Sequence, residues 1–75
     1  MSINDYIISL NWKFIGICGC MGAKTSKYAN MTYPNYEIRI AFSGNGVFQI
    51  RHNSVTRKAG TGLELFKIRY KKIFP

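Results

Sequence analysis

The stretch YEIRIAFSGNGVFQIRH, residues 36–52, constrains the fold of this 75-residue chain more than any other part of it. Two runs in which apolar and polar residues alternate flank the tripeptide Gly-Asn-Gly. Alternation with a period of two is typical of a half-buried β-strand, and glycine and asparagine between two such runs indicate a tight turn. The stretch therefore predicts an antiparallel hairpin over residues 36–53.

A three-residue loop is the connection that best fits the apolar residues of this hairpin. A two-residue turn at Asn45 and Gly46 would mix apolar and polar side chains on each face, because a shift of one residue moves side chains to the opposite face. A loop from Gly44 to Gly46 keeps the apolar side chains together, with Gly46 in the left-handed conformation that such loops need. The expected pairs are Phe42 with Phe48, Ile40 with Ile50, and Ile38 with His52.

The polar face of the predicted hairpin carries two arginines. The register places Arg39 directly opposite Arg51, with Glu37 one step along the strand. Like charges that face one another across a strand pair destabilise it by about 0.2–1 kcal/mol. In one interpretation both side chains extend into water and Glu37 neutralises one of them. In the other, two guanidinium groups are held ready for a phosphate or carboxylate, which arginine binds better than lysine does.

The remaining segments predict further strands and a short N-terminal helix. Ser2 and Asp5 have the spacing of a helix cap, so a helix through Leu10 is expected, although its apolar residues would also suit a strand. Residues 12–20 are rich in aromatic and branched side chains and predict a strand that is buried on both faces. Shorter strands are expected at a sheet edge over residues 26–29 and again over residues 54–58.

The C-terminal stretch TGLELFKIRYKKIF predicts a helix. Thr61 and Glu64 have the spacing of a capping box, placed just before an apolar run. At 100° per residue, one apolar stripe contains Leu63, Phe66, Tyr70, Ile73 and Phe74. A strand is the alternative, because residues 66–71 also alternate and because Leu65 and Ile68 lie off the stripe. The cap and the length favour the helix.

Together these elements predict one small basic domain of the α+β class, residues 1–75. A small antiparallel sheet of three to five strands, built on the central hairpin 36–53, is expected to pack against the C-terminal helix. The other face of the sheet is expected to be uncovered and to carry Arg39 and Arg51. An apolar content of 47% with five tyrosines, five phenylalanines and one tryptophan suits a packed core in a chain this short.

Charge is the strongest indication of a partner. The net charge is +8, and from Arg39 onward eight basic residues stand against Glu64 alone. Such an excess favours an anionic partner, either a nucleic acid, DNA or RNA, or an acidic protein surface, although basic side chains can also be only a solvated face. The candidate binding residues are Arg39, Arg51, Arg57, Lys58, Lys67, Arg69, Lys71 and Lys72.

The glycine-rich stretch FIGICGCMGAKTSKY, residues 14–28, has some of the letters of a phosphate-binding loop. That loop needs glycine, four residues, and then glycine followed directly by lysine. Here five residues separate Gly16 from Gly22, and Ala23 stands between Gly22 and Lys24. No nucleotide site is therefore predicted in this stretch, which is expected to be a strand followed by a turn with exposed lysines.

The two cysteines do not make a metal site. Cys18, Cys20 and the only histidine, His52, give three ligands, one fewer than a structural zinc site uses. Along one strand both thiols would point to the same side as small core residues, too close to bridge comfortably. The expectation is free, reduced thiols, with a redox pair or a metal ligand pair as the weaker alternatives, and neither a metal nor a cofactor.

Residues suited to catalysis are too scattered to predict an enzyme. Asp5, Glu37 and Glu64 lie far apart in the chain, and His52 has no partner that the sequence identifies. The run YEIRIAFSGNGVFQIRH followed by KKIFP resembles the C-terminal half of RelE-type ribonuclease toxins, in which arginines on a sheet hold RNA. The paired N-terminal helices of that family do not fit into the residues before the hairpin, so the chain is not assigned to it.

The leading hypothesis is a small non-enzymatic protein that contacts nucleic-acid phosphates through its basic sheet face and C-terminal helix. No groove-reading element is identifiable, so contacts to the backbone rather than to bases are expected. The alternative is a small phage or mobile-element inhibitor that binds an acidic surface of a partner protein. A homo-oligomeric structural component is the third hypothesis.

The N-terminal half of the chain bears on its location. The first residues lack the positive segment that opens a signal peptide. The longest apolar stretch, residues 6–21, is interrupted by Asn11 and Lys13, so no membrane span is expected. A cytoplasmic protein is predicted.

Overall fold

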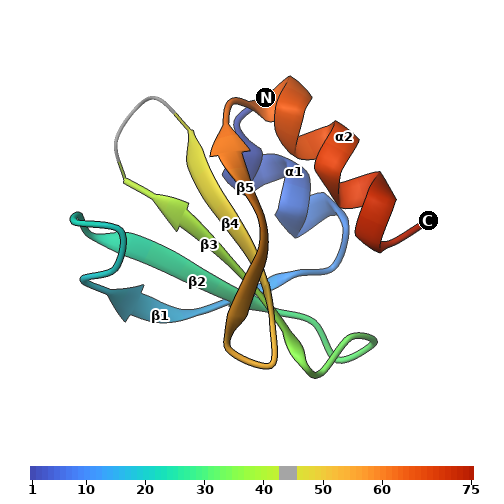
Figure 1. Cartoon of the computed structure of the whole chain (residues 1–75), viewed down its shortest axis with the longest axis horizontal. Helices are drawn as coiled ribbons and strands as arrows, with labels where there is room; N and C mark the ends of the chain where they lie inside the picture. Colours follow the sequence, from blue (N-terminus) through green and yellow to red (C-terminus); the bar gives the residue numbers. More distant parts are fainter. Residues whose placement is uncertain (43–45) are drawn as a thin grey trace.

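The computed structural model of the protein describes residues 1–42 and 46–75 (Figure 1). In chain order the elements are α1 (Ile3–Ser9), β1 (Lys13–Cys18), β2 (Thr25–Ala29), β3 (Tyr36–Ala41), β4 (Val47–His52), β5 (Val55–Thr61) and α2 (Leu63–Ile73). The strands form one antiparallel sheet in the order β1-β2-β3-β4-β5, so each strand pairs with its neighbours in the chain. The predicted α+β class and the packing of a C-terminal helix on the sheet are confirmed.

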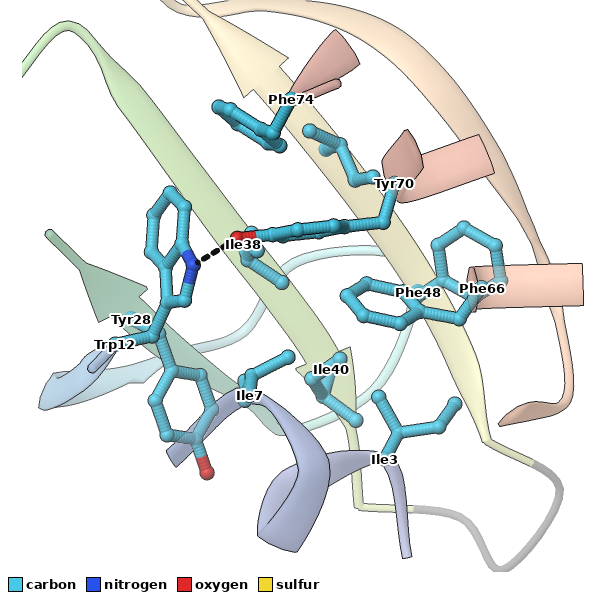
Figure 2. Packing of buried hydrophobic residues seen from close by; sticks show 11 residues of the cluster. Ile3, Ile7, Trp12, Tyr28, Ile38, Ile40, Phe48, Phe66, Tyr70 and Phe74 are labelled. Atoms are coloured by element: carbon cyan, nitrogen blue, oxygen red, sulfur yellow. Dashed lines mark hydrogen bonds between the residues drawn. The ribbon is translucent and has the colours of Figure 1, made fainter. Parts of the chain in front are cut away.

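Both helices lie on the same face of the sheet, which we call the covered face (Figures 1 and 2). Helix α1 begins as predicted, with the Ser2 hydroxyl accepting a hydrogen bond from the Asp5 backbone N–H at 3.1 Å. Helix α2 is also confirmed over the strand alternative, but the predicted capping box is wrong. Thr61 ends β5, and the N-cap is Gly62, which has no side chain with which to cap the helix.

The core lies between the covered face and the two helices (Figure 2). Ile38, Ile50 and Phe48 of the central hairpin are completely buried, as is Phe66 of α2. The α2 residues predicted as the apolar stripe all belong to this cluster or pack against it, namely Leu63, Phe66, Tyr70, Ile73 and Phe74. Ile68, which lies off the stripe, is 56% exposed. The helical period therefore identified the buried side of α2 correctly.

Aromatic rings connect the middle of the core. Trp12, just before β1, is 1% exposed, and its indole N–H donates a hydrogen bond of 3.0 Å to the Tyr70 hydroxyl. The Trp12 ring also meets the ring of Phe74, with centroids 5.6 Å apart. A buried indole N–H needs a hydrogen-bond acceptor, and here the Tyr70 hydroxyl oxygen supplies it. This contact fixes α2 to the start of the sheet, 58 residues away in sequence.

Helix α2 approaches β5 closely at Gly60. A β-carbon at this position would lie 2.5 Å from Leu65 Cδ2, so the helix rests directly on the glycine backbone. Leu65, which lies off the predicted stripe, is therefore half-buried against the strand. The predicted strand over residues 54–58 exists as the longer β5.

Two predictions about the first strands are wrong. Strand β1 is at an edge of the sheet rather than buried on both faces, and Phe14, Ile15 and Ile17 are each more than half exposed. An irregularity between Phe14 and Gly16 also interrupts its alternation. Strand β2 was expected at an edge but lies between β1 and β3. Apolar composition indicated that these residues form strands but not which neighbours those strands have.

The register of the central hairpin differs from the prediction by two residues. Ile40 lies opposite Phe48, Ile38 opposite Ile50, and Tyr36 opposite His52. Phe42, expected to pair with Phe48, is instead 54% exposed. A shift of two keeps every side chain on its predicted face, so the apolar pattern is satisfied equally well by both registers. Gly46 has the predicted positive φ of 68°, while most of the predicted loop lies outside the described residues.

Candidate functional site: a basic face of the sheet

The face of the sheet opposite the helices, which we call the uncovered face, carries two rows of polar side chains. Directly opposed residues of an antiparallel pair point to the same face. One row follows from the pairs Lys27 with Arg39 and Arg39 with Gln49. The next row runs across five strands through Lys13, Ala29, Glu37, Arg51 and Thr56.

Four cations therefore share this face, and we call Lys13, Lys27, Arg39 and Arg51 the basic face. The predicted arginines lie on it, but the prediction that they oppose one another is wrong. Arg39 is opposite Gln49, and Arg51 is opposite Glu37. The two-residue shift in register thus replaces the expected repulsive pair of arginines by an attractive pair of Glu37 and Arg51, while on the other side of β3 a like charge, Lys27, lies opposite Arg39.

Glu37 positions Arg39. The Arg39 Nε–H donates a charge-assisted hydrogen bond to Glu37 Oε1, and both side chains are only partly exposed, at 20% and 28%. A guanidinium has five N–H donors, and this bond uses one of them. Within the described residues neither Nη atom of Arg39 makes a hydrogen bond, so both remain for an external acceptor.

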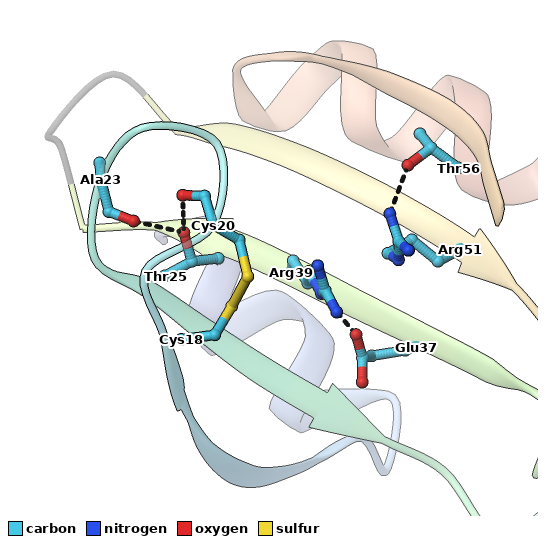
Figure 3. The surroundings of a disulfide bond; sticks show 8 residues. All are labelled: Cys18, Cys20, Ala23, Thr25, Glu37, Arg39, Arg51 and Thr56. Carbon is cyan, nitrogen blue, oxygen red and sulfur yellow. Dashed lines mark hydrogen bonds and ion pairs between the residues drawn. A yellow bond between two sulfur atoms is a disulfide. The ribbon is translucent and has the colours of Figure 1, made fainter. Parts of the chain in front are cut away.

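Arg51 is positioned by β5 and the turn before it. Its Nη1 donates to Thr56 Oγ1 at 2.8 Å and its Nη2 to the Ser54 carbonyl at 2.6 Å. Figure 3 shows Arg51 with Thr56, and Arg39 with Glu37, projecting from neighbouring strands on the side away from the helices. Two guanidinium groups in fixed orientations lose less side-chain entropy on binding an anion than two mobile ones.

A shallow hollow of about 350 Å³ adjoins these two arginines. Arg39, Arg51 and Glu37 form part of its wall, and Ile15, Ala29 and Pro34 form an apolar part. The hollow thus offers the guanidinium groups of Arg39 and Arg51 beside a small apolar surface. It is suited to an anionic group with a less polar moiety attached to it.

The other predicted binding residues do not join the basic face. Lys58 lies opposite Ile50 and so points to the covered side, and Arg57 is exposed at the irregularity of β5. On α2, Lys67 pairs with Glu64 at 3.4 Å and lies over the Tyr6 ring. The Nε of Arg69 is buried without a hydrogen-bond partner among the described residues, and Lys71 and Lys72 are exposed in the last turn.

The predicted cluster of charge in the second half of the chain is therefore divided between two sides of the molecule. Lys13 and Lys27, which join the basic face, were not among the predicted binding residues. The pairing of β2 with β3 would have identified Lys27, because it sets this residue opposite Arg39. The sequence carries no turn signal between residues 30 and 35 as clear as the Gly-Asn-Gly of the central hairpin.

The cysteines form a disulfide bond, so the prediction of free thiols is wrong. Cys18 ends β1 and Cys20 lies beyond it, where the chain has left the strand (Figure 3). Their Cα atoms are 5.4 Å apart, within the range that a disulfide spans and shorter than two residues of regular strand, about 6.6 Å. The following loop covers one end of the uncovered face, where the buried Thr25 hydroxyl donates to the Cys20 carbonyl at 2.9 Å.

Two titratable residues outside the basic face, Tyr70 and His52, pack against other aromatic rings. Burial raises the pKa of the Tyr70 phenol above its usual 10.0, against the opposing effect of the hydrogen bond from Trp12. Tyr70 thus belongs to the core, as its place on the apolar stripe predicted. His52 stacks on Tyr36, with ring centroids 4.4 Å apart. Among the described residues, no three potential metal ligands lie close enough together to hold an ion.

Comparison of the chain with protein-family models, with curated proteins and with solved structures gives no match. None of the helices in residues 1–42 and 46–75 is both long and apolar enough to cross a membrane.

Proposed function

We propose that this protein binds nucleic acid, without catalysing a reaction, by placing the basic face against the phosphate backbone. The observation that supports this most is the adjacency of Lys27, Arg39 and Arg51 on three neighbouring strands, with both guanidinium groups held in place by local hydrogen bonds. Adjacent strands are about 4.8 Å apart, so these cations form a continuous positive surface.

The electrostatics of the whole chain favour the same partner. With a net charge of +8, long-range attraction would concentrate a polyanion around the protein and speed its association. Glu37 is the one acidic side chain in the two rows, and it is neutralised by Arg39. A phosphate approaching the basic face thus meets little repulsion.

The proposal is for binding that depends weakly on base sequence. The two rows of the basic face contain no aromatic side chain on which a base would stack. The helices lie on the opposite side of the sheet, so neither is presented with the basic face to a groove. Contacts to phosphates alone position a protein on nucleic acid but do not read its sequence.

The proposed compartment is the cytoplasm, where a disulfide bond would meet reducing thiols. Cys18 and Cys20 lie at the end of the uncovered face, beside Thr25 rather than beside the arginines. We therefore expect the reduced and the oxidised protein to bind nucleic acid similarly, and binding is best measured both with and without dithiothreitol.

The experiment that tests this proposal is a fluorescence-anisotropy titration of labelled single- and double-stranded DNA and RNA over a series of salt concentrations. Four phosphate contacts predict a slope of log K against log salt of about −3 to −4. The double variant Arg39→Gln/Arg51→Gln should weaken binding at least tenfold at low salt and make the slope less steep by about 2.

The matched control removes the same number of charges elsewhere. Lys71→Gln/Lys72→Gln changes two exposed lysines of α2 and should reduce affinity much less than the arginine double variant. Equal losses for the two variants would mean that net charge, and not the basic face, determines binding. No binding of any of the four nucleic acids at low salt would overturn the proposal.

A further inference from the structure

Strand β1 is an edge of the sheet that no other strand of residues 1–42 and 46–75 covers. In Figure 1 it forms the outer border of the sheet on the side opposite β5. The outer N–H and C=O groups of an edge strand are unpaired and form a template for another strand. Proteins usually protect such edges with charged residues, prolines or bulges.

The protection of this edge is incomplete. Lys13 and the irregularity between Phe14 and Gly16 lie in its first half, but Gly16–Cys18 pairs regularly with β2 and carries no charge. Phe14, Ile15 and Ile17 are 53%, 53% and 55% exposed, and Met31, after β2, is 90% exposed. Scattered exposed apolar residues are ordinary, but these three residues of β1 lie on both sides of one unpaired edge, where a strand added to that edge would contact them.

A second hollow, of about 510 Å³, lies beside the start of β1. Ile15, Ala29, Met31 and Pro34 supply its apolar lining, with Lys13 among the polar residues. An extended segment alongside β1 would place an apolar side chain near this hollow while its backbone pairs with the strand. Alternate side chains of an added strand are the ones that enter such pockets.

The positive charges around this edge favour an acidic partner. Residues 6–36 contain Lys13, Lys24 and Lys27 but no aspartate or glutamate. A second copy of the chain would bring another +8 toward the same edge, which opposes self-association. An acidic segment would be attracted instead, and opposite charges across neighbouring strands stabilise their pairing.

We propose that β1 binds an extended acidic segment of another protein, one in which apolar residues alternate with aspartate or glutamate, as a sixth strand of the sheet. This makes the interaction-protein hypothesis specific and uses the outer edge of β1, which shares Lys13 with the basic face but includes neither Arg39 nor Arg51. The backbone of Gly16–Cys18 supplies the hydrogen bonds. Because of the irregularity between Phe14 and Gly16, Ile15 lines the hollow beside the arginines, whereas Ile17 lies opposite Ser26 on the covered side. The two isoleucines therefore supply apolar contacts on opposite sides of the added strand.

The test uses a fluorescein-labelled eight-residue peptide in which isoleucine or valine alternates with glutamate. Its binding to the full chain is measured by anisotropy, beside a peptide with lysine in place of every glutamate. We expect the acidic peptide to bind at least tenfold more tightly than the basic one. Equal binding of both, or no binding of the acidic peptide at millimolar concentration, would overturn the proposal.

Backbone methylation distinguishes strand addition from adhesion of side chains. Two versions of the acidic peptide are N-methylated, one at every isoleucine and valine and the other at every glutamate. An added strand turns only one of these amide sets toward β1, so one version should lose binding while the other keeps it. If both versions bind equally, or neither binds, strand addition is wrong.

A pair of protein variants locates the site. Ile17→Thr keeps a branched side chain suited to a strand and should weaken peptide binding about tenfold through lost apolar contact. Ile68→Thr is the matched control, since Ile68 is equally exposed at 56% but lies on α2. If the protein instead dimerises in sedimentation experiments and Ile17→Thr makes it monomeric, the occupant of β1 is a second copy and the proposal is overturned.

The proposal for nucleic-acid binding and the proposal for strand addition at β1 can be disproved independently. Arg39→Gln/Arg51→Gln should abolish the binding of nucleic acid while changing peptide affinity less than Ile17→Thr does. Ile17→Thr should in turn leave the binding of nucleic acid unchanged. A single surface that serves both ligands would show equal losses from both variants, which contradicts the assignment of β1 as a distinct site.

Discussion

The two faces of the sheet are built from the same five strands but differ in how their side chains are held. On the covered face, Ile38, Phe48 and Ile50 are completely buried beneath two helices. On the uncovered face, Arg39 and Arg51 are held by local hydrogen bonds to neighbouring side chains and one carbonyl. Stability is therefore concentrated on one face, and the other face is free to carry charge that folding does not require.

The position of the charges also bears on how so short a chain supports a net charge of +8. Repulsion among cations opposes a compact state, but the cations lie on two sides of the molecule, and exposed ones such as Lys71 and Lys72 are solvated and screened by salt. Aromatic side chains, each burying a large apolar area, fill the covered side instead. Variants on the covered face should accordingly change the free energy of unfolding, and variants on the uncovered face should change the binding of nucleic acid.

The largest effect is expected for Phe66→Ala in α2. Phe66 is completely buried and meets the ring of Phe48 edge-on, with centroids 5.0 Å apart. Removing a buried phenylalanine costs about 3–5 kcal/mol, a large part of the stability of a small domain. Urea denaturation followed by circular dichroism measures the change, and Ile68→Ala on the exposed side of α2 should cost far less. A loss for Phe66→Ala no greater than that of Ile68→Ala would contradict the packing described.

A smaller loss of stability, also from a residue packed on the covered face, is expected at alkaline pH. The buried Tyr70 phenol has its pKa raised in the folded protein above the unfolded value of 10.0. Its contribution to stability is thus fully present below pH 10.0 and is lost as the pH rises through the raised pKa. The free energy of unfolding should fall from about pH 10 upward.

Tyr70→Phe is the control for this decline. It removes the phenol that titrates while the other tyrosines and the lysines remain, so its stability should fall less steeply over the same pH range. At neutral pH the variant should be less stable than the original, by about 1–3 kcal/mol, because the buried Trp12 N–H loses its acceptor. An identical alkaline decline in both proteins would show that Tyr70 does not cause it.

The sequence predicted well which side of α2 and of the central hairpin is buried, because the apolar residues of each fall on one side. The stripe from Leu63 to Phe74 fits the helical period, and α2 buries that side. The alternation over residues 36–52 likewise assigned the side chains of β3 and β4 to their correct faces. In both cases one period, helical or strand, brings the apolar side chains of the segment to a single side, where they can be buried together.

The sequence predicted poorly the strand register and the strand neighbours, because several arrangements bury the same apolar residues. Registers that differ by two residues place the same side chains on the same faces, so the choice depends on the turn and on individual contacts such as the stacking of Tyr36 on His52. Apolar residues in β1 suited a central strand equally well, because composition does not specify neighbours. The Cys18–Cys20 bond depends on the chain leaving the strand after Cys18, which no sequence signal marked.

The candidate site was predicted in part for the same reasons. Arg39 and Arg51 were identified because they lie in the hairpin, but their mutual position depended on register and was wrong. Lys27 depended on the pairing of β2 with β3, and Lys58 on its place opposite Ile50. Charge clustered along a chain therefore does not imply charge clustered on a surface, because neighbours in a strand point to opposite faces.

The smallest expected effect on stability comes from Glu37→Gln, and it distinguishes the two faces most sharply. The pair with Arg39 is partly exposed, so its loss should change the free energy of unfolding by about 0.5 kcal/mol or less. Binding of nucleic acid should instead strengthen severalfold, since the variant removes the one negative charge from the two rows while the glutamine Oε1 can still accept the hydrogen bond that positions Arg39. Anisotropy titration at low salt measures this gain.

Glu64→Gln is the matched control for this variant. It raises the net charge by the same amount but removes the partner of Lys67 on α2, on the covered side. If phosphates contact the basic face, Glu37→Gln should strengthen binding more than Glu64→Gln, and the difference should shrink as salt is added. Equal gains from the two variants would show that the net charge alone matters, and the uncovered face would then have no special part in binding.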